Sequence, residues 1–179
     1  VLNADTGVTV RLTGPAALND DEFATVSEGM GFALVLSVIL VLGLLFLALR
    51  SFKLIFATFA TLTVGLILTF AFATIAVGGL NLISIAFAVM FIGLSIDFGI
   101  QYGVRYGQEK LSGHTDALQR AGTILARPLT LAAIATAVGF AAFIPTDYRG
   151  VSELGIIATA GMAITLVLNV TLLPALLAL

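Results

Sequence analysis

Four stretches of the sequence carry no charged side chain, and a fifth is interrupted only by Asp97 and, near its end, Arg105. The first stretch would extend about 31 Å as a helix, enough to cross a hydrocarbon core of about 30 Å. The chain is 60% hydrophobic and 10% charged, whereas soluble domains carry about 25% charged residues. The sequence therefore predicts an all-α membrane protein, a bundle of five transmembrane helices at about 29–49, 54–77, 82–106, 128–145 and 154–176.

The segment before the first apolar stretch has a different character. Residues 7–13 alternate apolar and polar side chains, which is typical of a half-buried strand, and residues 16–28 read as a short acidic helix. A lone strand is not stable by itself, so we expect its partner strands to lie in sequence outside this chain. Residues 1–27 are thus predicted to be the tail of a soluble α+β domain, followed by the transmembrane bundle at 28–179.

A polar segment separates the third and fourth predicted spans. Leu111, Leu118, Ala121 and Leu125 are spaced as on one face of an amphipathic helix at about 108–126. Pro128 suits the first turn of the helix that follows, because its missing N–H needs no partner there. We therefore predict a separate cytoplasmic amphipathic helix and a new span that begins at Pro128.

Basic residues are distributed unequally between the two ends of the predicted spans. Segments 50–53 and 105–127 lie at the same end, and the opposite turns hold only Arg149. Loops rich in Lys and Arg remain in the cytoplasm. The basic end is therefore predicted to be cytoplasmic, the amino-terminal segment periplasmic and the carboxyl end cytoplasmic. The basic residues at that end are Arg50, Lys53, Arg105, Lys110, Arg120 and Arg127.

Asp97 lies within the third apolar stretch, about 5 Å to the cytoplasmic side of its middle. A carboxylate at that depth costs about 2.5–3.5 kcal/mol on insertion scales, and removal from water favours its neutral form. An acid that changes charge with its surroundings is suited to carry a proton. The competing interpretation is an aspartate that only hydrogen-bonds a neighbouring helix. Because acids inside membrane spans are costly and usually functional, we favour the proton-carrying interpretation.

Gly93, Gln101 and Arg105 share a helix face with Asp97, because all four stand at steps of four residues. Gln101 is a candidate to pass or orient the proton through water, or to form a hydrogen bond between helices. Arg105 lies about 12 Å farther toward the cytoplasm. With Arg50, Lys53 and Arg127, it is expected to anchor the bundle at the cytoplasmic interface.

Glycines Gly99, Gly103 and Gly107 form a second stripe on the same predicted helix. Small residues at this spacing let helix backbones approach closely in a membrane, so these glycines, together with Gly93, are predicted to serve helix packing. Thr58, Thr61, Gly65 and Thr69 make a comparable seam in the second span. Their hydroxyls are expected to bond their own backbone.

Nothing in the sequence indicates catalysis, a cofactor or a metal site. The chain contains no cysteine and one histidine, His114, which lies in a polar loop and is expected to be solvated. That composition leaves no set of zinc ligands. The chain also lacks a phosphate-binding loop and any basic-aromatic patch suited to nucleic acid. We therefore expect no enzymatic activity and no nucleic-acid partner.

The segment from Phe91 to Tyr106 resembles the fourth transmembrane helix of resistance-nodulation-division (RND) transporters, and more narrowly of their MmpL-type branch. That branch has a Gly-x3-Asp-Tyr/Phe motif at the proton-relay acid, matched here by Gly93, Asp97 and Phe98. Segments 149–155 and 172–176 resemble the fifth-to-sixth helix region. Within the branch, the sequence of residues 96–106 is most similar to that of hopanoid-biosynthesis-associated RND exporters. Phe98 stands where many relatives have tyrosine, which puts a tyrosine contribution to the relay in doubt.

The resemblance implies helices two to six of one half, the first, of a two-half transporter with twelve spans. The five-helix unit of this family is related to the sterol-sensing domain. The implied function is proton-driven export of a hydrophobic or lipid-like substrate, such as a hopanoid, across a bacterial inner membrane. The expected partners are protons, membrane lipid, the missing second half and further copies of the chain. Two alternatives stay open: a helper of protein export of the SecD/SecF type, and a lipid-binding module of the sterol-sensing type.

Overall fold

The computed structural model describes residues 15–49, 51–78 and 82–179, and these residues form five α-helices. The helices are α1 (Pro15–Leu49), α2 (Phe52–Ala76), α3 (Leu82–Leu111), α4 (Ala117–Ala141) and α5 (Arg149–Ala178). Four stretches are long and apolar enough to cross a membrane: α2, residues 87–111 of α3, α4 and α5. The chain is therefore a multi-pass membrane protein with an all-helical bundle, as the sequence predicted.

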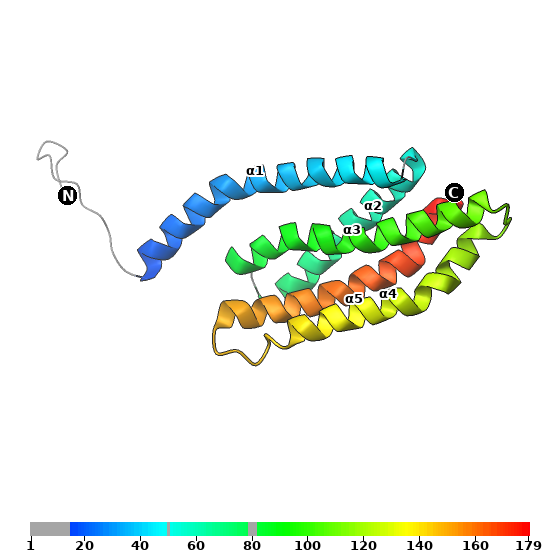
Figure 1. Ribbon diagram of the computed structural model, residues 1–179. Helices are drawn as coiled ribbons and strands as arrows, with labels where there is room; N and C mark the ends of the chain where they lie inside the picture. The colour runs from blue at the N-terminus through cyan, green and yellow to red at the C-terminus, as the bar shows by residue number, and fades with distance from the viewer. Residues whose placement is uncertain (1–14, 50, 79–81) are drawn as a thin grey trace, which may run out of the picture.

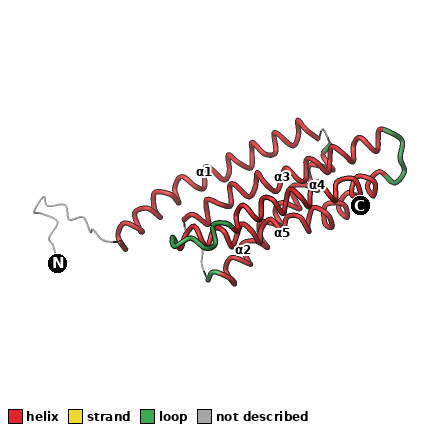
Figure 2. Tube along the Cα trace, turned by 60° about the horizontal axis from the view of Figure 1, so that its bottom comes forward, coloured by secondary structure: helices red, strands yellow, loops and turns green. Residues whose placement is uncertain are grey.

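The helices run alongside one another in an elongated bundle (Figures 1 and 2). Helix α5 packs against α2, α3 and α4, while α1 packs on α3 and α2. The amino-terminal part of α1 extends away from the bundle (Figure 1). Its apolar part, Gly31–Leu47, is 17 residues long, or about 26 Å as a helix. The fifth span, at 29–49, remains a prediction.

Three groups of buried apolar side chains hold the described helices together. Leu45 and Leu49 of α1 meet Leu54 of α2 and Ile92 of α3 in the first group. The second places Phe91 of α3 with side chains of α2 and α5, and the third joins α3 to α4 and α5. Because α3 contributes to all three groups, every other helix fixes its orientation.

The prediction of a separate amphipathic helix at 108–126 is wrong. Residues 108–111 are the last turn of α3, residues 112–116 form a turn, and α4 already begins at Ala117. Gly113 adopts a φ of +79°, a left-handed conformation that ends a helix and that glycine adopts without steric cost. Leu111, expected on the apolar face of an amphipathic helix, is 91% exposed.

The predicted start of a span at Pro128 is also wrong, because Pro128 lies inside α4. A proline at this position removes one hydrogen bond from the helix ladder. Membrane helices tolerate such interior prolines, since nearby groups satisfy the freed backbone. Helix α1 likewise runs without interruption from Pro15 to Leu49, through the expected boundary at 28. The predicted strand at 7–13, Arg50 and residues 79–81 lie outside the described residues.

Candidate functional site

Helix α3 presents two chemically different faces, and the exposed one carries Asp97. Gly93, Asp97 and Gln101 are all exposed in the bundle. Met90 and Val104 continue the same face and are 42% and 39% exposed. No side chain among the described residues lies within 4 Å of where a Cβ on Gly93 would be. The residues that the sequence grouped on one stripe therefore lie on a face that no described helix covers.

Asp97 lies at membrane depth on this face. It is ten residues from Phe87 and fourteen from Leu111, the ends of the apolar stretch of α3, or about 15 Å and 21 Å along the helix. Neither the side chain of Asp97 nor that of Gln101 hydrogen-bonds another described residue. A carboxylate that faced lipid at this depth would cost several kcal/mol, so such acids face protein or a water-filled cavity.

The opposite face of α3 is buried and contains hydroxyl groups. Ser95 and Thr165 share a hydrogen bond of 3.0 Å between α3 and α5. The amide of Asn169 donates to the backbone oxygen of Thr165 over 2.9 Å. Sequence reasoning did not bring these three residues together, because isolated polar residues in apolar helices do not reveal which of them meet. The bond between Ser95 and Thr165 joins α3 to α5 behind the exposed face, whereas the bond of Asn169 lies within α5.

The glycine stripe has unequal surroundings along its length. A Cβ on Gly99 would collide with the side chain of Thr58 in α2, and one on Gly103 would lie 2.6 Å from a methyl group of Leu49. Gly107 has open space around it. The structure therefore places close helix contacts at two of the three glycines, whereas Gly93 and Gly107 lie in open surroundings.

The threonine seam of α2 is buried within the bundle and consists of Thr58, Thr61, Gly65 and Thr69. Thr61 and Thr69 donate hydrogen bonds to the backbone oxygens of Ala57 and Gly65, four residues earlier. This is the local bonding expected of threonine in a membrane helix. Thr58 is 2% exposed, and its hydroxyl has no hydrogen-bond partner among the described residues.

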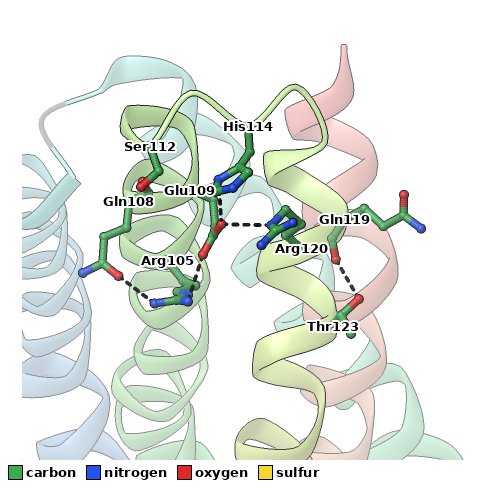
Figure 3. Close-up of polar contacts among 8 residues, drawn as sticks. All are labelled: Arg105, Gln108, Glu109, Ser112, His114, Gln119, Arg120 and Thr123. Atoms are coloured by element: carbon green, nitrogen blue, oxygen red, sulfur yellow. Dashed lines mark hydrogen bonds and ion pairs between the residues drawn. The ribbon is translucent and has the colours of Figure 1, made fainter.

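An ion-pair cluster centred on Glu109 joins the end of α3 to the start of α4 (Figure 3). The side chain of Glu109 is 8% exposed, and its carboxylate lies 2.8 Å from Arg105 and 3.2 Å from Arg120. Arg105 also donates to Gln108. His114, expected to be solvated, has its Nδ1 3.1 Å from Glu109 but out of line for a hydrogen bond. The cluster holds the turn at 112–116 in place.

Sequence reasoning missed Glu109, although one signal was present. Arg105 and Glu109 stand four residues apart, the spacing of an ion pair on a helix. Arg105, expected as an interfacial anchor, is committed to this cluster. Lys53 and Arg127, the other described anchors, are exposed and form no ion pair with a described residue. Their anchoring role remains a prediction.

Glu109→Gln is expected to lower the free energy of unfolding of the full-length protein by about 1–2 kcal/mol. Glutamine keeps the shape but leaves two guanidinium groups without a counter-charge. The loss stays below that of a fully buried pair because Arg105 and Arg120 are 35% and 46% exposed. The measurement is chemical or thermal unfolding in detergent. Asp147→Asn is the control, because Asp147 is exposed and forms no ion pair with a described residue, and an equal loss in both variants would contradict the prediction.

Residues 1–179 match the MMPL family over the whole chain. The chain belongs to the MMPL family. This membership confirms the resemblance to MmpL-type RND transporters, which rested on Gly93, Asp97 and Phe98. It also agrees with the four apolar helices of the described bundle.

Two relatives named hopanoid transporter HpnN are similar to this MMPL chain. The protein of Rhodopseudomonas palustris (strain TIE-1) is 49% identical over 178 residues, covering 98% of this chain. That of Burkholderia multivorans (strain ATCC 17616 / 249) is 49% identical over 173 residues, covering 96%. The chain spans only 20% of the length of either relative.

Proposed function

We propose that this chain is the proton-relay half-bundle of an exporter that moves a hydrophobic or lipid-like molecule, of the hopanoid class, using the proton motive force. The observation that carries the proposal is the position of Asp97, on an exposed face of α3 at membrane depth. Membership of the MMPL family and two relatives named hopanoid transporter support a transport role and the substrate class.

The exposed face of α3 is the surface on which the missing half would pack. Asp97 and Gln101 need polar surroundings at this depth, and no described helix of the bundle supplies them. A second bundle with its own polar groups would enclose the acid and exclude lipid. This arrangement agrees with relatives about five times longer than the chain. The full protein is expected to lie in a bacterial inner membrane, with the Glu109 cluster on the cytoplasmic side.

In the proposed cycle, Asp97 takes up a proton from the periplasmic side and loses its charge. A neutral acid no longer requires the same polar partners, so α3 shifts against the other half. Release of the proton to the cytoplasm restores the charge and the first arrangement. Gln101, one turn toward the Glu109 cluster, is the candidate to orient water along the exit path. The role is transport, and none of these steps requires a covalent intermediate.

The lipid-exporter proposal competes with the protein-export helper and the sterol-sensing module. The names of both relatives favour the exporter. The test is full-length protein in proteoliposomes that contain a hopanoid. Imposing a proton gradient is expected to move the hopanoid in one direction, and a protonophore is expected to stop it. Movement that is unaffected by the protonophore would reject proton coupling, and no movement of hopanoid would reject the substrate class.

A further inference from the structure

One face of α4 changes from polar to apolar along its length. Asp116, the residue before α4, shares a helical face with Arg120, Thr123 and Arg127, and all four are exposed. The same face continues through apolar side chains that are 53–63% exposed: Leu131, Ile134 and Val138. The buried residues of α4, Ala117, Ala121, Leu129 and Ala133, lie on the opposite side. The exposed stripe therefore points away from the described bundle.

An open hollow lies at the polar end of this stripe. It has a volume of about 340 Å³ and is lined by Asp116, Gln119, Arg120, Thr123 and Ile124. The Nε of Arg120 donates to Glu109 over 3.2 Å, and this bond fixes the guanidinium beside the hollow. The two terminal nitrogens of Arg120 have no partner among the described residues. The hollow thus offers a held guanidinium with donors to spare.

The hollow also contains an acid, and this restricts what fits it. The carboxylate of Asp116 forms no hydrogen bond with its own helix, and it stands one helical turn, about 6 Å, from Arg120. Arg127 adds a second positive charge on the same face. The hydroxyl of Thr123 already donates to Gln119, so Thr123 is not a donor for a ligand. Along the stripe, a negative charge at Asp116 is therefore followed by positive charges at Arg120 and Arg127.

We infer that this face of α4 binds a phospholipid with a primary ammonium headgroup, of the phosphatidylethanolamine type. The phosphate lies between Arg120 and Arg127, whose planar guanidinium groups suit phosphate oxygens. The ammonium group donates to Asp116. The acyl chains follow Leu131, Ile134 and Val138 into the bilayer. Basic sites at the ends of membrane helices bind lipid headgroups.

The inference concerns a resident lipid and does not depend on transport or on the identity of the cargo. An anionic phospholipid without an amine would satisfy the two arginines but leave Asp116 facing the phosphate. A choline headgroup carries the positive charge but has no N–H to donate. The ethanolamine headgroup matches both charges and the donor requirement. The stripe therefore distinguishes these three headgroups.

The test is titration of delipidated full-length protein with phosphatidylethanolamine, phosphatidylglycerol and phosphatidylcholine, with bound lipid counted by native mass spectrometry. Phosphatidylethanolamine is expected to bind about fivefold more tightly than the other two, the factor that a partly exposed charge pair supplies. Asp116→Asn is expected to abolish this preference. Arg127→Gln is expected to weaken all three lipids about equally. Soluble glycerophosphoethanolamine, which lacks acyl chains, is expected not to bind.

Lys110→Gln is the matched control, because Lys110 is exposed at the same end of the bundle but lies on α3. It is expected to leave binding of all three lipids unchanged. Equal binding of the three lipids, or a preference that survives Asp116→Asn, would overturn the inference. So would tight binding of glycerophosphoethanolamine, which would indicate a site for a soluble phosphate compound. Absence of any bound lipid would overturn it as well.

Discussion

Asp97→Asn in the full-length protein is expected to reduce gradient-driven export about fiftyfold at a membrane potential of about 100 mV. Moving one elementary charge through that potential is worth about 2.3 kcal/mol, and about 1.4 kcal/mol changes an equilibrium tenfold. Asparagine has nearly the shape of aspartate but cannot take up a proton, so the conformational equilibrium loses this bias. The measurement is the initial rate of hopanoid movement in proteoliposomes.

Two variants separate loss of coupling from loss of structure. Asp97→Glu keeps a titratable carboxyl group on the same face of α3 and is expected to retain measurable export. Asp147→Asn removes an acid from the exposed turn between α4 and α5 and is expected to export normally. Thermal unfolding of each variant checks that it is folded. A folded Asp97→Asn protein that exports at the unmodified rate would show that another group carries the proton.

The helices themselves could be predicted from the sequence because the apolar stretches are long and separated by short polar turns. Helix α2 was expected at 54–77 and is found at Phe52–Ala76. The errors lie where backbone conformation decides the outcome. The pattern of Leu111, Leu118 and Leu125 suggested one helix, but the left-handed conformation of Gly113 divides it. A periodic pattern reports which side chains share a face only if the helix is continuous.

The orientation of Asp97 could not be predicted from the sequence. Spacing placed Gly93, Asp97 and Gln101 on one face, but in a membrane the lipid and the protein interior are both apolar. The pattern of apolar residues therefore does not show which face is buried. Only packing of α3 against α1, α2, α4 and α5 shows that this face is left uncovered and that Ser95 points to the interior.

The Glu109 cluster depended on a turn that sequence spacing does not reveal. The pair of Arg105 and Glu109 follows from helical periodicity. Arg120 reaches the same carboxylate only because the turn at 112–116 reverses the chain and sets α4 beside α3. His114 was assigned to solvent because it lies in a loop, yet that loop is held against Glu109. Contacts between residues on either side of a turn cannot be predicted from their spacing, since the geometry of the turn decides which side chains meet.

Gly99→Ala is expected to lower the free energy of unfolding of the full-length protein by about 1–3 kcal/mol, the usual cost of overpacking. The added Cβ would collide with the terminal methyl group of Thr58 and lie 3.3 Å from its Cβ and its hydroxyl oxygen. Thr58 is 2% exposed and cannot turn away without displacing its neighbours. Helices α2 and α3 must therefore separate. The measurement is thermal unfolding in detergent.

A substitution of Thr58, the residue that the added Cβ would hit, tests whether this collision causes the loss of stability. In a Thr58→Ala background the methyl group and the unpaired hydroxyl are both absent, so Gly99→Ala is expected to cost about 1 kcal/mol less there than in the unmodified protein, within the usual range of coupling for contacting residues. Gly107→Ala is the matched control, because it lies on the same stripe with nothing within 4 Å. It is expected to be neutral or slightly stabilising, since alanine favours helix over glycine. Equal losses at Gly99 and Gly107, with no rescue by Thr58→Ala, would show that the contact between α2 and α3 does not depend on glycine at this point.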